Sequence, residues 1–67
     1  MTTLRVTSPV SERLTRYPRS LGRAEDRAKT LARLVGTAEI QRRDGDSWLT
    51  VETYDLRGYR VVRRGER

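Results

Sequence analysis

Apolar residues recur at helical spacing in the middle of the chain, and this stretch carries the clearest structural signal. Between Ser20 and Gly36 they form a continuous stripe. Ser20 has a hydroxyl suited to an N-cap, and Gly36 suits the left-handed position that ends a helix. The pattern predicts a helix over about 21–35, whose apolar face comprises Leu21, Ala24, Ala28, Leu31, Ala32 and Val35.

Alternating apolar and polar residues on both sides of this helix predict β-strands. The expected strands are about 3–8, 12–17, 37–43, 47–54 and 59–64, although residues 12–17 are also compatible with a loose helical turn. This order favours an α+β fold, a small single domain over residues 1–67. We expect an antiparallel sheet of four to five strands (β-β-α-β-β-β) with one helix packed on one face.

The Asp44-Gly45 pair fixes the expected register of the central hairpin. Asp-Gly between two alternating runs is typical of a two-residue turn with positive φ at both positions. With these residues as the loop, Ile40 lies opposite Leu49 and Ala38 lies opposite Val51. The apolar residues then share the face that the helix covers, with Val62, Leu14 and Leu4 or Val6 extending the core.

The same register places aromatic and basic residues together on the opposite, open face. This predicted partner-binding face consists of Trp48, Tyr54, Tyr59, Arg43 and Arg63, with Arg42 or Arg60 at its rim. Tryptophan, tyrosine and arginine are enriched at protein-interface hot spots, and sheet-borne aromatics also stack on nucleic-acid bases. A purely structural interpretation remains: cross-strand pairs stabilise a half-exposed sheet, and arginine stems cover Trp48.

The charge balance is strongly basic. Lys and Arg total 15 against 9 acidic residues, giving a net charge of +6, which favours an anionic partner. Lys29 is the only lysine, and such an arginine bias is also typical of GC-rich genomes. A second basic surface on and near the helix is interpreted as a solvated face, with nonspecific phosphate attraction as the alternative; it comprises Arg16, Arg19, Arg23, Arg27 and Arg33.

The composition lacks the residues that most often form enzyme active sites and metal sites. Cysteine and histidine are absent, so the chain lacks thiolate ligands, disulfides and the commonest general base. The carboxylates show no paired spacing, and no glycine-rich phosphate loop is present. We therefore expect no enzyme activity, no cofactor and no metal. No apolar run approaches a membrane span of about 18 residues, which favours a cytoplasmic protein without a membrane partner.

In size and pattern the chain resembles the small, arginine-rich accessory proteins of phages and mobile elements from GC-rich bacteria. The resemblance rests on Tyr17-Pro18-Arg19-Ser20, the alanine-rich helix and Arg42-Arg43-Asp44-Gly45-Asp46-Ser47-Trp48. It implies a non-enzymatic binding module, in the host cytoplasm if phage-encoded, that engages one macromolecule through the aromatic and arginine sheet face. The expected partner is a host protein or a second copy of the chain, and nucleic acid bound to the same face is the alternative.

Overall fold

The helix begins and ends where the sequence predicts. The computed structural model describes residues 3–56 and 60–62, and α1 spans Leu21–Val35. Ser20 Oγ accepts a hydrogen bond of 3.2 Å from the backbone N–H of Arg23. Gly36 has a φ of 100°, and its N–H donates to the carbonyl of Ala32 at 2.7 Å. Both caps satisfy backbone groups that the helix itself leaves without partners.

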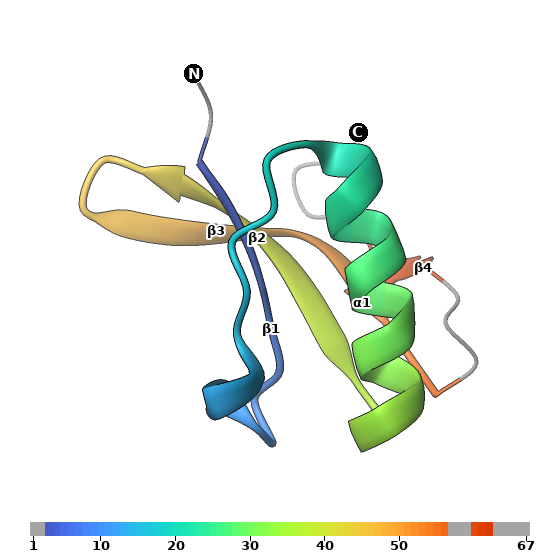
Figure 1. The fold of residues 1–67 in the computed structure, drawn as a ribbon. Helices are drawn as coiled ribbons and strands as arrows, with labels where there is room; N and C mark the ends of the chain where they lie inside the picture. Colours follow the sequence, from blue (N-terminus) through green and yellow to red (C-terminus); the bar gives the residue numbers. More distant parts are fainter. Residues whose placement is uncertain (1–2, 57–59, 63–67) are drawn as a thin grey trace.

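One face of an antiparallel sheet packs against this helix (Figure 1). Strands β1 (Leu4–Thr7), β2 (Ala38–Asp44) and β3 (Ser47–Tyr54) are neighbours in that order, and α1 lies mainly across β1 and β2. A short segment, β4 (Arg60–Val62), pairs with the end of β3. The prediction of a small α+β fold with one helix on one face is thus confirmed, whereas the sheet of four to five strands is not.

The strand expected over residues 12–17 is wrong. Glu12–Leu14 form a short 3-10 helix (η1), closed by hydrogen bonds from Leu14 N–H to Ser11 O and from Thr15 N–H to Glu12 O. After this turn the chain extends, and the backbone of Arg16 exchanges two hydrogen bonds of 2.8 and 3.0 Å with Val6. The segment from 15 to 19 therefore runs beside β1 and leads into α1 (Figure 1).

The core lies between α1 and the covered face of the sheet. The alanines of α1 are completely buried, so the helix backbone approaches the strands closely. Leu21 and Leu49, both expected in the core, are instead 47% and 41% exposed. The buried apolar residues are Val6, Ala24, Ala28, Leu31, Ala32, Ala38, Ile40 and Tyr54, with Leu4, Leu14, Val35 and Val51 packed partly against them.

The turn of the central hairpin lies one residue later than predicted. Asp44 pairs with Ser47, so the two loop residues are Gly45 and Asp46. Gly45 has a φ of 64°, and Asp46 does not have a positive φ. This pattern fits a type II′ turn, which needs glycine only at its first central position. The predicted turn would have required a positive φ at Asp44, which is unfavourable for a residue with a Cβ.

A β-bulge then changes which residues of β3 face the helix. Gln41 pairs with Thr50 but Ile40 pairs with Glu52, so Val51 is the extra residue. The expected pairing of Ile40 with Leu49 is therefore wrong. Because one extra residue reverses the alternation of a strand, the later side chains of β3 turn toward the core. The bulge allows the large ring of Tyr54, opposite Ala38, to be buried while Val51 also packs against the core.

Candidate functional site

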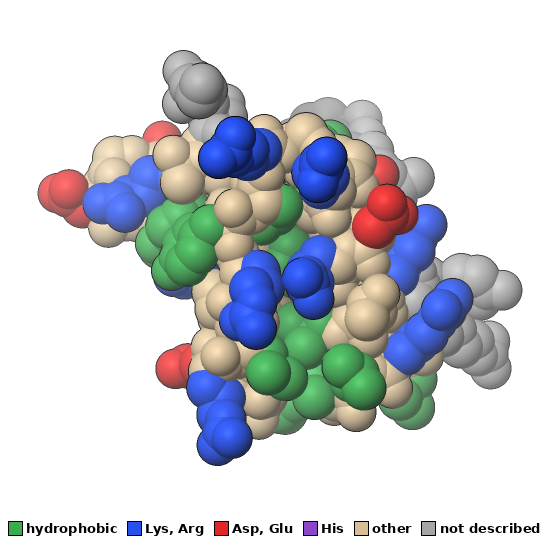
Figure 2. Space-filling view, viewed as in Figure 1, with side chains coloured by type: hydrophobic (Ala, Val, Ile, Leu, Met, Phe, Trp, Pro, Cys, Tyr) green, Lys and Arg blue, Asp and Glu red, His purple; other side chains and the backbone are tan. Residues whose placement is uncertain are grey.

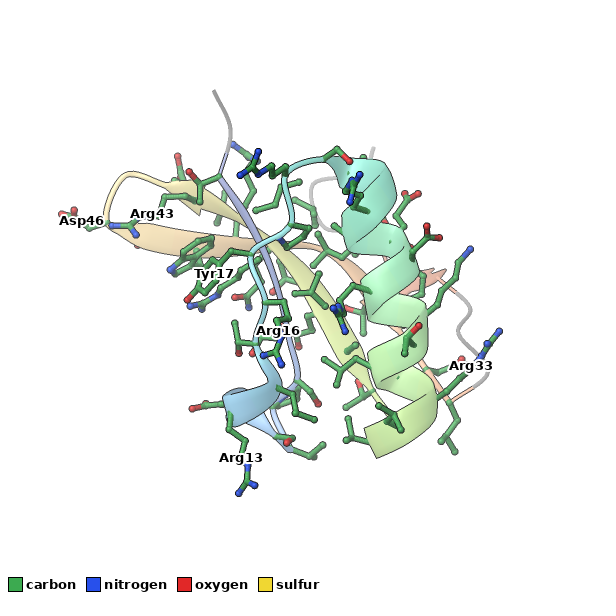
Figure 3. The ribbon with its side chains drawn as sticks, in the orientation of Figure 1. Arg13, Arg16, Tyr17, Arg33, Arg43 and Asp46 are labelled. Carbon is green, nitrogen blue, oxygen red and sulfur yellow. The ribbon has the colours of Figure 1, made fainter. Side chains whose placement is uncertain are left out.

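The sheet face opposite α1 brings together side chains from three strands and from the segment that follows η1. Trp48 on β3 lies directly opposite Arg43 on β2, and Arg5 on β1 lies opposite Gln41. Tyr17 reaches this face from the segment that follows η1 (Figure 3). The central ring, Trp48, is half-buried although it lies outside the core.

Two guanidinium groups and one phenol ring contact the Trp48 indole. The guanidinium carbon of Arg5 lies 4.2 Å from the ring centroid, and that of Arg43 lies 5.4 Å away. The ring of Tyr17 is tilted by 55° with its centroid 6.3 Å from that of Trp48. Each such cation–π contact stabilises an exposed site by about 0.5–1 kcal/mol. We call Arg5, Tyr17, Arg43 and Trp48 the aromatic–arginine cluster.

Hydrogen bonds through Nε fix both arginines of the cluster. Arg5 Nε donates to Oε1 of Gln41 at 2.6 Å, and Arg43 Nε donates to the carbonyl of Gly45 at 2.6 Å. The terminal guanidinium nitrogens of both residues make no hydrogen bond within the described part of the chain. The cluster thus presents oriented donors, which lowers the entropy cost of binding an acceptor.

The far end of the same face is polar and acidic. Gln41 Nε2 donates to Oε1 of Glu39 at 3.0 Å and to Oγ1 of Thr50 at 3.2 Å, and Thr50 Oγ1 in turn donates to Glu39 at 3.1 Å. Beside them, a hollow of about 420 Å³ is lined by residues that include Glu12, Glu39 and Tyr17. The face therefore has Trp48 and Arg43 near the hairpin turn and two glutamates near η1, and Arg5 contacts Trp48 while it also lines this hollow.

Only part of the predicted binding face is assembled in this way. Trp48 and Arg43 lie together as expected. Tyr54 does not join them, because after the bulge its ring is 2% exposed and belongs to the core. Arg42 is exposed but lies opposite Leu49, on the other side of the sheet from Arg43. The backbone of Arg60 pairs with Tyr54, whereas Tyr59 and Arg63 lie outside the described residues.

The sequence interpretation missed Arg5 and Tyr17. Alternation in 4–7 already places Arg5 on the face opposite Val6, but nothing in the sequence indicates that this strand pairs with β2. The backbone of Arg16 pairs with Val6. The position of the next residue, Tyr17, on the open face therefore depends on a bridge between segments far apart in the sequence. The usable signal was an aromatic residue held in an extended conformation before Pro18.

The described residues contain neither a cluster of metal-ligating side chains nor a helix that could span a membrane. Within 3–56 and 60–62, His, Cys, Asp and Glu nowhere gather in sets of three or more that would hold a metal ion. Over the same residues no helix combines the length and the apolar character that crossing a bilayer requires. Comparison of the chain with protein-family models, with curated proteins and with solved structures found no match.

Proposed function

We propose that this chain is a non-enzymatic binding module, of the phage-accessory type, that engages a protein partner through the open sheet face. The partner is a host protein or a second copy of the chain. The aromatic–arginine cluster carries the proposal. Trp48 is half-buried between Arg5, Arg43 and Tyr17, and this is the composition of an interface hot spot.

The charge arrangement of the face supports a partner with two oppositely charged ends. Arg43 lies near the hairpin turn, whereas Glu39 and Glu12 line the hollow toward η1, together with Arg5. A second copy docked by a two-fold axis provides this complement, since each basic end then lies over the acidic end of the other copy. Self-association is therefore the version to test first.

Sedimentation velocity over a range of concentrations tests that version. The wild type should form a dimer, and Trp48→Ala should shift it to monomer because the central contact is lost. Leu34→Ala is the matched control, since Leu34 is 72% exposed on α1, away from the open sheet face. Arg43→Glu and Glu12→Arg should each weaken the dimer, and their combination should restore it, because the swapped charges face one another again.

A monomeric wild type would exclude the second copy and leave a host protein as the partner. Immobilised wild type, Trp48→Ala and Leu34→Ala proteins would then be compared for what they retain from host lysate. A protein retained by the wild type and by Leu34→Ala, but lost with Trp48→Ala, supports the proposal. If nothing retained depends on Trp48, the proposed function is wrong.

Nucleic acid on this same face is less favoured by the geometry. A base that stacks on Trp48 needs an open ring face, but Arg5 lies only 4.2 Å from the ring centroid and is fixed by Gln41. Stacking would first require Arg5 to give up both contacts. A protein carboxylate, in contrast, accepts hydrogen bonds from the terminal nitrogens of Arg5 and Arg43 as they stand.

A further inference from the structure

A second surface, which shares only Tyr17 with the aromatic–arginine cluster, is a basic hollow beside α1. It lies between the segment from 15 to 19 and the N-terminal half of α1 and has a volume of about 540 Å³. Figure 2 shows Lys and Arg side chains gathered on this side of the molecule. Its lining residues are Arg16, Tyr17, Pro18, Arg19, Arg23, Asp26, Arg27 and Thr30.

The positive charge in this hollow is only partly neutralised by the protein. Four guanidinium groups line the hollow. Among the described residues, Asp26 contributes the one carboxylate in its lining. Within the described chain, the side chains of Arg19, Arg23 and Arg27 make neither a hydrogen bond nor an ion pair. Arg23 and Arg27 are four residues apart on one helix face, where like charges repel. A bound anion would relieve this repulsion.

The sequence analysis grouped these arginines with Arg33 as a solvated basic surface, but it did not predict a hollow, because two of them precede the helix. The bridge between Arg16 and Val6 holds the incoming segment in place, and α1 starts directly after Ser20. Arg16 and Arg19 are thereby brought to the wall opposite Arg23 and Arg27. Guanidinium groups converging from two walls suit phosphate oxygens, which accept bidentate hydrogen bonds from arginine.

An exposed aromatic ring at the border of the hollow specifies the ligand further. Tyr17 lines the hollow and is 62% exposed, and its ring centroid lies 6.3 Å from that of Trp48. An exposed ring beside phosphate-binding arginines allows an unpaired base to stack while its backbone follows the arginines. A paired base in a duplex cannot stack in this way, and an inorganic phosphate would not use the ring.

We propose that the hollow formed by Arg16, Arg19, Arg23 and Arg27 binds the phosphate backbone of single-stranded nucleic acid, with a base stacked on Tyr17. This site shares Tyr17 with the aromatic–arginine cluster, but its four arginines lie outside that cluster. The strand would follow the arginines beside α1 and reach the border of the open sheet face at Tyr17, the residue that the two sites share.

The number of arginines sets the expected salt dependence. Four phosphate contacts on a single strand give a slope of log K against log salt of about −2.8, because each contact releases condensed counterions. Between about 50 and about 200 mM salt, the affinity should therefore fall about 50-fold. Removal of two arginines should reduce the slope to about −1.4.

Fluorescence anisotropy with a labelled oligothymidylate of about 20 nucleotides tests the proposal. The site variant is Arg23→Gln with Arg27→Gln, and the matched control is Arg13→Gln with Arg33→Gln. Both pairs remove the same charge from exposed positions, but Arg13 and Arg33 do not line the hollow and point away from Arg16 (Figure 3). Circular dichroism of each variant verifies that the fold is retained.

The proposal requires the site variant to lose affinity and salt slope while the control pair keeps the slope of the wild type. Tyr17→Leu should weaken binding and Tyr17→Phe should not, since the ring alone is needed.

Four outcomes would contradict the proposal. If the site variant and the control variant lose the same affinity, binding depends only on the overall charge of the protein, and the proposed site is wrong. Tighter binding of the matching duplex, or equal competition by polyglutamate, would overturn the single-stranded ligand. Displacement by inorganic phosphate at constant ionic strength would show a simple anion site and overturn it too.

Discussion

The hydroxyl of Tyr54 donates a hydrogen bond of 2.9 Å to Oε1 of Glu52, and both side chains are buried. The two residues are separated only by Thr53 on β3, so both face the helix after the bulge at Val51. A carboxyl group in this position needs hydrogen-bond donors, because burial removes its water. The Tyr54 hydroxyl therefore supplies one of the donors that the buried carboxyl group of Glu52 needs.

Removal of the Tyr54 hydroxyl should lower the free energy of unfolding. Tyr54→Phe keeps the buried ring but takes this donor from Glu52, and we expect a loss of about 1–2 kcal/mol. Tyr17→Phe is the matched control, since Tyr17 is 62% exposed and should tolerate the change with an effect near zero. Urea unfolding followed by circular dichroism measures both. Equal stability of the two variants would contradict a structural role for the Tyr54–Glu52 hydrogen bond.

The two helix glycines should respond to alanine with opposite signs. Gly36 has a φ of 100°, so Gly36→Ala should cost about 1 kcal/mol through backbone strain, although only Leu56 Cδ2, at 4.0 Å, lies near the new methyl group. Gly22 lies inside α1 with open space around its Cα, and Gly22→Ala should stabilise the protein by about 0.5–1 kcal/mol. Thermal unfolding of both variants gives the signs. A stabilising Gly36→Ala would refute the left-handed cap.

Arg5 should protect the Trp48 ring more than Arg43 does. Its guanidinium carbon is closer to the ring centroid, 4.2 against 5.4 Å. Arg5→Ala should therefore destabilise the protein by about 0.5–1 kcal/mol and shift the tryptophan emission to longer wavelength, because water reaches the indole. Arg43→Ala should have the smaller effect on both quantities.

Arg42→Ala is the control for this comparison. Arg42 is exposed on the opposite side of the sheet, where it pairs with Leu49. Its substitution by alanine should therefore leave the Trp48 emission unchanged. Steady-state fluorescence of Trp48, the only tryptophan, provides the measurement directly. A red shift of the same size in all three variants would mean that Arg5 does not cover the ring.

The local elements could be predicted from the sequence because their signals are local. The stripe over 21–35, the Ser20 hydroxyl and the Gly36 conformation all act within a few residues of one another. The two-residue length of the hairpin loop was likewise predictable, though its position was shifted by one residue because glycine adopts the positive φ alone.

The candidate site depended on contacts between segments far apart in the chain. Arg5 joins Trp48 only because β1 pairs with β2, and Tyr17 joins them only because Arg16 bridges to Val6. The order of apolar and polar residues over 12–17 suggests a strand. In the structure, Glu12–Leu14 instead form the 3-10 helix η1, which is closed by local hydrogen bonds. No local pattern contains these pairings.

By itself, the sequence determined the helix, its caps and the alternation that produces strands. Only the tertiary structure decided the side to which each residue of β3 belongs. One extra residue, Val51, turns Tyr54 from the predicted binding face into the core and leaves Trp48 on the open side. The physical reason is that a strand has a period of two, so a single bulge reverses every later side chain, and burying Tyr54 against α1 favours that reversal.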